Sequence, residues 1–324
     1  MMTATEVETP TQSQGIVSIG VPVYNGARFL DACLKSLTSQ TYRDLDIVVC
    51  DNASTDGTSE IGLKWAAKDP RVRYYRSPEN RGAARNFNWA LELARGEFFR
   101  WCASDDACAP ECVERCVEVL NKDMSLVLCS TQVTDIDVNG NFLRFKQSGP
   151  LAGAKRPSER FGELMDMSHT CEQVFGLIRM ANLRRTRGIA AYSDSDRVLL
   201  AELALHGRFF EIPQSLFLHR LHEGSSVEQY PDRRERTKWF DTNASTAWVF
   251  PYFRQLVEYG YAIHRSGVKG GEKLRCIGML FSWSWYHREL LLGDVICNIK
   301  SGLKRRAPWV AAAWRLLRKG LARS

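Results

Sequence analysis

Acidic residues follow two apolar runs of the sequence at the points where these runs stop. Asp51 comes directly after the apolar residues 47–50, and the adjacent pair Asp105 and Asp106 follows the run 98–102. Short apolar runs of this kind are typical of strands buried on both faces, and open α/β sheets bind ligands at the carboxyl ends of their strands. Two adjacent carboxylates repel one another unless they are solvated or neutralised by a cation. The pair therefore fits a hard divalent metal held together with substrate phosphates, although Asp-Asp is also common in loops.

The turn after Asp51 allows two interpretations. Asn52, Ser54, Asp56 and Gly57 supply turn and capping chemistry, so Asp51 and Asp56 could simply cap the next helix. Alternatively, the Asp51 carboxylate could accept an N–H of a nucleobase such as uracil or thymine. We expect Asp56 to be a turn and cap residue in both cases.

Two further polar segments could belong to the same site. Residues 22–26, Pro-Val-Tyr-Asn-Gly, end the first apolar run, and their Asn-Gly pair turns the chain toward a helix. Asn80-Arg81-Gly82 precedes another helical stretch, where free backbone N–H groups and a guanidinium suit an anion. Each segment alone also fits an ordinary polar turn.

The elements that must position these residues alternate along the first part of the chain. Strand-like runs cover residues 17–23, 45–50, 72–75, 98–102 and 126–130, and helical stretches cover 28–37, 58–67, 84–94 and 110–120. This alternation predicts βαβ units and an α/β fold with a mostly parallel sheet. Asn139-Gly140, between the runs 134–138 and 142–145, predicts a hairpin.

Later segments are more mixed. Helices are expected near 159–165 and 197–206, strands near 209–212 and 216–220, and a mostly helical, aromatic region from about residue 237 onward. With 324 residues, 44% of them hydrophobic, the chain can form one large or two modest globular domains. We expect a disordered tail at 1–14 that lacks signal-peptide features, a catalytic domain at 15–236 and a helical extension at 237–324.

Ten cysteines are scattered through apparent core segments, and none forms a Cys-x-x-Cys pair. This distribution predicts reduced thiols in a cytoplasmic protein. Cys108, Cys112 and Cys116 recur every four residues, which could indicate a metal or redox face. Because Val113 and Val117 belong to the expected buried stripe beside them, we interpret these cysteines as small apolar residues.

The net charge of +7 is concentrated near the C-terminus. The last segment carries no acidic residue and contains the basic residues Lys300, Lys304, Arg305, Arg306, Arg315, Arg318, Lys319 and Arg323. Residues 308–321 place apolar side chains beside basic ones, which suits a helix lying on an anionic membrane surface. An ordinary helix that packs on the domain with a solvated basic face explains the pattern equally well. No run of apolar residues is long enough to predict a spanning helix.

Four segments together resemble the family 2 glycosyltransferases of the GT-A fold, over roughly residues 16–225. These segments are Val-Ser-Ile-Gly-Val-Pro-Val-Tyr-Asn-Gly (17–26), Val-Val-Cys-Asp-Asn-Ala-Ser-Thr-Asp-Gly-Thr (48–58), Asn-Arg-Gly-Ala-Ala-Arg-Asn (80–86) and Ser-Asp-Asp (104–106). The resemblance implies a Rossmann-like GT-A sheet with flanking helices, a nucleotide-sugar donor, a divalent metal such as Mn²⁺ or Mg²⁺, and inversion at the anomeric carbon.

The resemblance also implies roles for individual residues. Asp51 would bind the nucleobase, Asp105 the ribose or diphosphate, and Asp106 the metal. The nucleotide pocket would further be lined by Pro22, Tyr24, Asn25 and Arg81. The chain has Ala103-Ser104 before the acidic pair and so departs from the longer Asp-x-Asp-Asp form of the metal motif. Metal binding would therefore depend mainly on Asp106.

The family usually takes its catalytic base from a Glu-Asp pair at the start of a later helix. Here Ser195 stands where Glu is common, and Leu199 matches the family's following leucine, so the resemblance favours Asp196 over Asp194 as the base. A base is needed because the acceptor hydroxyl must lose its proton as it attacks. One of these residues could instead cap the helix, and Asp194 can do so without conflict.

A segment near the end of the expected catalytic domain completes the candidate site. Residues 216–222 resemble the part of the family where a His faces the metal or diphosphate. Strand alternation puts Arg220 and His222 on one face and His219 on the other. We therefore expect His222 as a metal ligand and Arg220 as a diphosphate ligand.

The leading interpretation is an inverting glycosyltransferase that uses a UDP-, dTDP- or GDP-sugar and acts on a lipid-linked glycan, polysaccharide or glycolipid at the inner face of a membrane. A sugar-phosphate nucleotidyltransferase is the alternative, but it should have a glycine-rich basic loop after the first strand, and Tyr24-Asn25-Gly26-Ala27 is not one. A catalytically inactive sugar-nucleotide-binding protein is a further alternative. We expect no nucleic-acid partner, because the basic tail with its two tryptophans is weak support for one.

Overall fold

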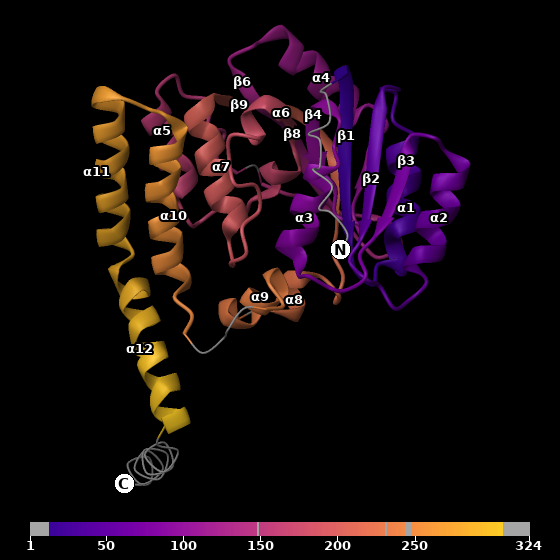
Figure 1. Cartoon of the computed structure of the whole chain (residues 1–324). Helices are drawn as coiled ribbons and strands as arrows, with labels where there is room; N and C mark the ends of the chain where they lie inside the picture. Colours follow the sequence, from indigo (N-terminus) through magenta and orange to yellow (C-terminus); the bar gives the residue numbers. More distant parts are fainter. Residues whose placement is uncertain (1–12, 148, 231, 244–247, 307–324) are drawn as a thin grey trace, which may run out of the picture.

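A nine-stranded sheet with the strand order β3-β2-β1-β4-β8-β6-β9-β5 forms the centre of the molecule, and β7 pairs with β6 at its side (Figure 1). The computed structural model describes residues 13–147, 149–230, 232–243 and 248–306. The strands are β1 (Ser13–Val23), β2 (Leu45–Asp51), β3 (Val72–Arg76), β4 (Gly96–Trp101), β5 (Ala107–Cys108), β6 (Leu126–Ile136), β7 (Phe142–Phe145), β8 (Leu177–Arg179) and β9 (Arg208–Arg220).

The first half of the sheet follows the predicted βαβ pattern. Strands β1, β2, β3 and β4 pair in parallel, and they are connected by α1 (Ala27–Thr38), α2 (Thr58–Lys68) and α3 (Ala83–Glu92). α4 (Cys112–Lys122) then leads into β6. Because all four strands run the same way, their carboxyl ends meet at one edge of the sheet.

The second half of the sheet is mixed, whereas a mostly parallel sheet was expected. β8 lies between β4 and β6 and runs antiparallel to both, and β5 runs antiparallel to β9. The β6–β7 hairpin at Asn139-Gly140 is confirmed, with Gly140 at φ 89°. Short strands such as β5 and β8 carry too few residues for a sequence pattern, and neither was predicted.

Two pairs of predicted strands are each a single long strand. β6 covers the predicted runs up to Ile136, and β9 covers both 209–212 and 216–220. In the β6–β9 ladder Ile212 pairs with Thr131 and Ser215 with the next residue, so Pro213 and Gln214 bulge out of register. A bulge accommodates Pro213, which cannot donate a hydrogen bond to the ladder. The residues between the two predicted strands therefore do not end β9.

Helix boundaries differ only slightly from the predicted ones. α5 (Pro157–Met165) and α7 (Ser195–His206) lie where helices were expected, and α4 begins two residues after Pro110. β1 begins at Ser13, inside the predicted tail, whose residues 1–12 lie outside the described residues. Short helical segments that were not predicted are η1 (Glu172–Phe175), α6 (Met180–Leu183) and α8 (Ser226–Gln229).

The three evenly spaced cysteines lie in the core beside α4. Cys108, Cys112 and Cys116 are all buried and all unpaired as disulfides. The buried Arg100 guanidinium donates from Nη1 to Cys112 Sγ at 3.1 Å. Val113 and Val117 belong to the same hydrophobic cluster, as predicted for the apolar stripe of this helix.

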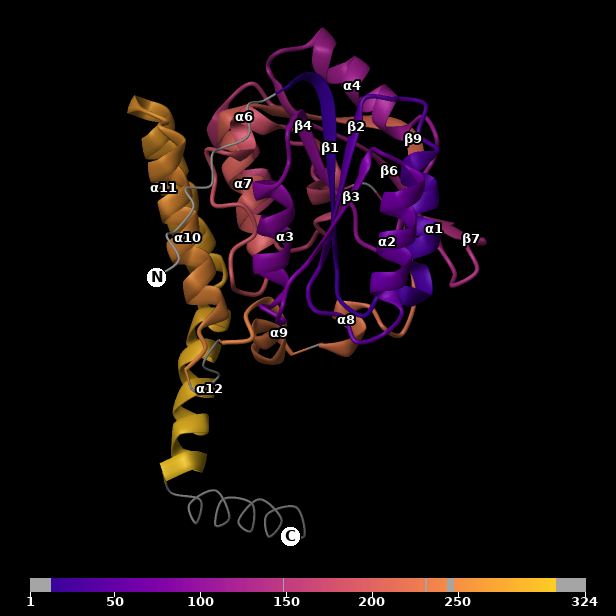
Figure 2. The same ribbon diagram turned by 45° about the vertical axis from the view of Figure 1, so that its right-hand side comes forward.

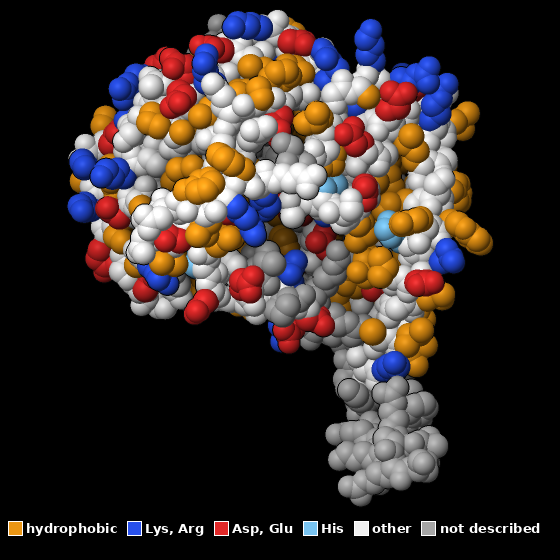
Figure 3. All heavy atoms as spheres, turned by 180° about the vertical axis from the view of Figure 1, so that it is seen from behind, with side chains coloured by type: hydrophobic (Ala, Val, Ile, Leu, Met, Phe, Trp, Pro, Cys, Tyr) orange, Lys and Arg blue, Asp and Glu red, His pale blue; other side chains and the backbone are white. Residues whose placement is uncertain are grey.

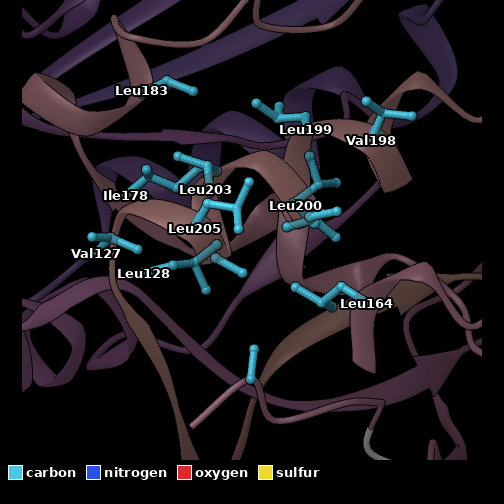
Figure 4. Packing of buried hydrophobic residues seen from close by; sticks show 14 of the residues in the cluster. Val127, Leu128, Leu164, Ile178, Leu183, Val198, Leu199, Leu200, Leu203 and Leu205 are labelled. Atoms are coloured by element: carbon cyan, nitrogen blue, oxygen red, sulfur yellow. The ribbon is translucent and has the colours of Figure 1, made fainter. Parts of the chain in front are cut away.

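α7 is buried on all sides, which is unusual for a helix outside a large core. Its residues from Val198 to Leu205 are buried, and Figure 4 shows Leu203 and Leu205 beside Val127, Leu128 and Ile178 of the sheet. A helix that is apolar all round needs a second cover on its outer side. That cover is the C-terminal helical region.

The C-terminal helices α10 (Pro251–Ser266), α11 (Gly270–Tyr286) and α12 (Arg288–Arg306) follow α9 (Arg233–Phe240). Tyr259 of α10 and Cys276 and Trp283 of α11 belong to the same buried cluster as α7. Trp283 Nε1 also donates to the Met165 carbonyl at 3.0 Å. The core is therefore continuous across the expected boundary at residue 236. In the described ranges, none of the helices combines the length and apolar composition that crossing a bilayer would require.

Ion pairs with buried carboxylates join α10 to α7 and to the loop before α7. Arg265 of α10 donates from Nε and Nη2 to both carboxylate oxygens of the buried Glu202, at 2.8 and 2.9 Å. Glu258, also buried, accepts from Arg187 at 3.0 Å and lies 2.7 Å from Arg254. A buried carboxylate is stable only when such partners compensate its lost hydration.

We predict that Arg265→Ala destabilises the protein, because it leaves the Glu202 carboxylate buried without its bidentate partner. The free energy of unfolding in urea should fall by about 3 kcal/mol. Arg275→Ala is the matched control, since Arg275 pairs with Glu272 at the surface of α11 and should cost less than about 1 kcal/mol. Equal losses for the two variants would contradict a structural role for the Arg265–Glu202 pair.

Candidate active site

The carboxyl ends of β1, β2 and β4 bring the loops of the sequence motifs to one edge of the sheet. β1 and β2 end in register at Val23 and Asp51, and the Asn52 N–H donates to the Val23 carbonyl at 2.9 Å. A Cβ atom on Gly26 would lie 3.1 Å from Ser104 Oγ, so the turn after β1 lies against the loop after β4. α8 and α9 lie at this same edge (Figures 1 and 2).

Asn86 of α3 fastens two of these strand ends together. Its side-chain Nδ2 donates to the Cys50 carbonyl at 2.9 Å and to the Val23 carbonyl at 3.3 Å. Asn88, two residues farther along and thus on nearly the opposite side of the helix, donates to and accepts from the backbone of Ile189, in the loop before α7. α3 thereby links the ends of β1 and β2 to the loop that precedes α7, the helix that carries Asp196.

Asp51 is fully buried, with 0% of its surface exposed. The Ser54 N–H donates to its Oδ1 at 2.8 Å and the Tyr74 hydroxyl donates to its Oδ2 at 2.6 Å. Arg76 Nη1 lies 3.7 Å from the same Oδ2. Burial and the hydrogen bond to Asp51 raise the pKa of Tyr74, which keeps its phenol group a hydrogen-bond donor. Asp51 thus lies at the predicted edge and is already held by neighbours.

Tyr74 and Arg76 were not among the predicted site residues. Both belong to β3, and the β2–β3 register places Arg76 directly opposite Asp51. The sequence shows a strand at this position but not its register, so these contacts could not be predicted. An aromatic and a basic residue close to the end of the neighbouring strand were the available signal.

In the segment Asn80-Arg81-Gly82, where an anion site was predicted, two backbone N–H groups already have side-chain acceptors. The Arg81 N–H donates to Asn52 Oδ1 at 3.0 Å and the Gly82 N–H to Asn80 Oδ1 at 2.9 Å. The expectation of free backbone N–H groups was therefore wrong for these two residues. Only the Arg81 side chain is directed to the surface, where its Nε lies 3.2 Å from Glu79 Oε1.

Gly82 also explains how α9 approaches this loop. Its φ is +83°, and an added Cβ would meet the backbone oxygen of Phe240 at 2.5 Å. A residue with a side chain would be strained here and would push the end of α9 away.

The turn after β1 is mainly structural. Asn25 adopts φ 52°, donates its N–H to Ser54 Oγ at 2.9 Å, and accepts the Thr55 N–H at 2.8 Å. Pro22 is buried within β1, whereas Tyr24, 49% exposed, and Asn25 are both at the surface, so the nucleotide-binding roles expected for these residues stay predictions. The contacts show Asn25 joining the β1 and β2 turns.

The prediction for Asp56 is confirmed. Its Oδ1 accepts the Thr58 N–H at 3.0 Å at the start of α2, and its Oδ2 accepts the Ala27 N–H at 3.1 Å at the start of α1. Although burial opposes the charged form, the hydrogen bonds from Thr58 and Ala27 lower the pKa of Asp56.

Asp105 and Asp106 lie in the loop between β4 and β5. Asp106 is buried, and its Oδ1 accepts the Arg220 N–H at 2.9 Å. Burial, together with the neighbouring Asp105 charge, holds the pKa of Asp106 well above its ordinary value. A positive charge beside this carboxylate would relieve both effects.

The end of β9 supplies the residues that surround the acidic pair. Arg220 donates from Nε to the Asp105 carbonyl at 2.8 Å and from Nη1 to the Asp137 carbonyl at 2.9 Å. His222 Nε2 lies 2.8 Å from Asp105 Oδ2. The side of the strand predicted for Arg220 and His222 is confirmed, because His219 instead pairs with Asp135 at 2.9 Å.

The tautomer of His222 follows from its second contact. The Gly224 N–H donates to His222 Nδ1 at 3.1 Å, so Nδ1 is an acceptor and the proton of the neutral ring lies on Nε2. Nε2 therefore donates to Asp105. In this arrangement His222 supports Asp105 directly, and ligating a metal through Nε2 would require that hydrogen bond to break.

The residues present fit a hard divalent cation by their chemistry. A buried carboxylate at Asp106, a second at Asp105 and an imidazole at His222 are ligand types that Mn²⁺ accepts. Among the described residues, no group of three or more His, Cys, Asp or Glu side chains is already arranged to hold a metal ion. A cation held here would thus need further ligands, and diphosphate oxygens are such ligands.

Asp194 and Asp196 lie at the start of α7. Asp194 is the N-cap residue, with φ 64° and no capping hydrogen bond from its side chain, and it accepts from Ser193 Oγ at 3.0 Å. Asp196 Oδ1 accepts the Arg197 N–H at 2.8 Å. Burial and the nearby Asp194 charge raise the pKa of Asp196 to about 6.

Arg197 anchors this helix start and was not predicted. Its guanidinium donates to the carbonyls of Asp166 and His169, each at 2.7 Å, and Nη1 lies 2.9 Å from His169 Nε2. Asp196 and the acidic pair of the β4–β5 loop thus lie in separate groups of contacts. The role of Asp196 stays a prediction.

Comparison with known proteins identifies the family. The description "Glycosyl transferase family 2" matches residues 18–182, just over half of the chain. Chondroitin synthase from Escherichia coli is 36% identical over 136 residues, which are 42% of this chain and 20% of that protein. Hyaluronan synthase from Pasteurella multocida is 34% identical over 128 residues, 40% of this chain and 13% of that protein. The aligned regions are therefore small parts of much longer relatives.

Solved structures support the fold. Residues 1–349 of Staphylococcus aureus TarS in complex with UDP-GlcNAc give a TM-score of 0.61 at 16% identity, covering 88% of this chain and 81% of that one. The mannosyltransferase PcManGT from Pyrobaculum calidifontis, in complex with GDP-Man and Mn²⁺, gives 0.53 at 20% identity, covering 98% and 82%. The mixed sheet with its flanking helices is the GT-A fold, and the chain belongs to glycosyl transferase family 2.

Proposed function

We propose that this glycosyltransferase moves a sugar, with inversion, from a nucleotide diphosphate to a hydroxyl of a glycan, polysaccharide or glycolipid. The observation that carries the proposal is the edge of the sheet where Asp51 and the Asp105–Asp106 pair lie, with Arg220 and His222 packed against that pair. The end of this edge near Asp51 suits a nucleobase, and the end near the acidic pair suits a diphosphate with its cation.

The donor side follows from these contacts and from the structural relatives. TarS was solved with UDP-GlcNAc and PcManGT with GDP-Man and Mn²⁺. By analogy, Asp51 would accept a base N–H, with UDP or dTDP favoured over GDP, and Asp105 and Asp106 would hold the diphosphate end. The bound cation would offset the negative charge that develops on the leaving diphosphate. Arg220 would act mainly by fixing the acidic loop, because its Nε and Nη1 donate to backbone carbonyls.

Asp196 would accept the proton of the attacking hydroxyl. A carboxylate with a pKa of about 6 is a better proton acceptor than an ordinary one and is still mostly ionised at neutral pH. Arg197 is a positioning residue, since its contacts to residues 166 and 169 hold the first turn of α7 in place.

The acceptor class is inferred from the relatives. Chondroitin and hyaluronan synthases are polysaccharide synthases by name, and the chain resembles a short part of each. We propose action on a growing glycan or lipid-linked glycan at the cytoplasmic face of a membrane. The basic tail predicted to bind that membrane, residues 300–324, lies outside the described residues from 307 onward.

Family membership does not support the nucleotidyltransferase alternative, but an inactive homologue would share the same fold. A thermal-shift comparison of UDP, dTDP and GDP, each with and without Mn²⁺, followed by measurement of nucleoside diphosphate release from the matching sugar donor, separates the two. An enzyme should show both stabilisation and release. Binding without release in the presence of a panel of oligosaccharide acceptors would favour the inactive homologue.

We predict that Asp106→Asn removes the Mn²⁺-dependent stabilisation by the preferred nucleotide. At a nucleotide concentration near 100 Kd the wild-type midpoint should rise by on the order of 5 °C, and the variant should lose most of the part that requires Mn²⁺. Asp44→Asn, at an exposed aspartate between α1 and β2, is the matched control. A Mn²⁺ effect that persists in Asp106→Asn would contradict the metal role.

We predict that Asp51→Asn weakens nucleotide binding through the base alone. Uracil N–H recognition needs an acceptor, and the loss of a hydrogen bond to a charged group costs about 1.5–3 kcal/mol, or at least about tenfold in Kd. Calorimetry should show this loss for UDP but not for Mn²⁺ with inorganic pyrophosphate. If both ligands weaken equally, Asp51 only supports the fold of the site.

We predict that activity falls as the pH decreases through about 6, because Asp196 must be ionised to accept a proton. Asp196→Asn should reduce kcat by at least about a hundredfold while nucleotide binding persists. Asp194→Asn should move the acidic limb of the kcat profile to lower pH, since it removes a neighbouring negative charge. An active Asp196→Asn enzyme with an unchanged acidic limb would exclude Asp196 as the base.

A further inference from the structure

The outward face of α11 and α12 is apolar and uncovered. Leu274, Phe281 and Trp285 are 71%, 73% and 74% exposed, and Leu292, Ile296 and Ile299 continue the row at 49–59%. These residues recur at spacings that place them on one side of a helix. Figure 3 shows hydrophobic side chains along the outer side of this pair of helices, with basic side chains among them. We call the six residues the outer stripe.

The orientation of the helices is fixed by their opposite face. Asp294 Oδ2 accepts the Tyr252 and Phe253 N–H groups at the start of α10, at 2.8 and 3.2 Å. Asn298 donates to the Val249 carbonyl at 2.7 Å and accepts the Val249 N–H at 3.0 Å. Rotating α12 to bury the outer stripe would leave these buried polar groups without partners. The stripe is therefore a second face that the fold leaves uncovered.

The chemistry around the stripe is that of a bilayer interface. Trp285 and Tyr286 are large aromatic residues with a polar atom, and the Arg288 guanidinium lies 5.2 Å from the Trp285 ring. The basic residues at the surface outnumber the acidic ones, which are Glu289 and Glu272, the latter paired with Arg275. The basic positions on or beside α11 and α12 whose side chains are described are Lys269, Lys273, Arg275, Arg288 and Lys300. Aromatic residues and cations together favour the headgroup region of anionic lipids.

A second copy of the chain fits the same face less well. A helix–helix seam requires aliphatic residues at each contact position, but Gly278 and Arg288 fall on the stripe between Leu274, Phe281, Trp285 and Leu292. The helix is also interrupted at His287, between α11 and α12. A bilayer surface tolerates both features because it does not need matching side chains.

We propose that the outer stripe binds the surface of an anionic lipid bilayer, with α11 and α12 lying in the interfacial layer and Arg288 and Lys300 reaching the headgroups. The inference uses none of the donor-site chemistry. It concerns residues 274–300 and is distinct from the amphipathic segment 308–321 near the C-terminus.

The test is co-sedimentation of the full chain with vesicles of phosphatidylcholine alone or of phosphatidylcholine mixed equally with phosphatidylglycerol. The wild type should bind the anionic vesicles, and more weakly as salt rises. Phe281→Ser with Trp285→Ser should weaken binding by at least about tenfold, because two large apolar side chains leave the interface. Phe142→Ser with Phe145→Ser, an exposed aromatic pair on β7 at 58% and 72%, is the matched control and should bind like the wild type.

Several results would overturn the proposal. Equal binding by the Phe281/Trp285 double variant would locate membrane contact elsewhere in the chain, and a loss confined to the Phe142/Phe145 variant would locate it on β7. No preference for anionic over neutral vesicles would remove the role of the cations. A wild type that binds no vesicles and is a dimer by light scattering, with a monomeric Phe281/Trp285 variant, would show that the stripe binds a second copy. Urea unfolding of each variant verifies that it is folded.

Discussion

Repulsion between the adjacent carboxylates Asp105 and Asp106 is the constraint on which the rest of the site depends. Both lie at the end of a buried strand, where burial and the neighbouring charge already raise the pKa of Asp106. The last residue of β9, Arg220, and His222 after it contact the pair. These contacts hold the loop in shape, yet Arg220 gives its Nε and Nη1 to carbonyls rather than to the carboxylates. The carboxylates thus remain under-neutralised, which is the condition that favours a cation with phosphate oxygens.

The position of α7 in the candidate site depends on the C-terminal helices. α7 carries Asp196 and is buried on every side, whereas the sheet can cover only one of its faces. α10 covers the other, and the Arg265–Glu202 pair fixes the two helices against each other. The helical extension is therefore part of the structure that positions the proposed base. This explains why one hydrophobic cluster includes both α7 and Trp283 of α11.

Sequence patterns predicted the elements, turns and caps formed by residues close together in the chain. They missed the features that depend on how distant strands pair. The strand–helix alternation, the Asn139-Gly140 hairpin and the cap at Asp56 follow from residues close together in the chain, and the structure confirms them. The insertion of β8 between β4 and β6 and the contact of Tyr74 with Asp51 are set by pairing between distant strands. The expectation of free N–H groups at Arg81 and Gly82 was wrong for a related reason. Asn52 and Asn80 were each recognised in a motif, but their contacts with one another and with the Arg81 N–H require the two loops to meet.

The proposed assignment of the base to Asp196 rather than Asp194 depends on burial and on contacts within the start of α7. Both carboxylates lie at the N-terminus of α7, where the helix dipole favours negative charge. For Asp196, burial and the Asp194 charge outweigh the hydrogen bond from the Arg197 N–H and the Arg197 charge, so its pKa rises to about 6. Asp194 occupies the left-handed N-cap position and accepts from Ser193, which makes it the supporting charge of the pair. A base two residues into the helix, strengthened by a neighbour in the cap, needs no glutamate at position 195, so Ser195 is compatible with the proposed chemistry.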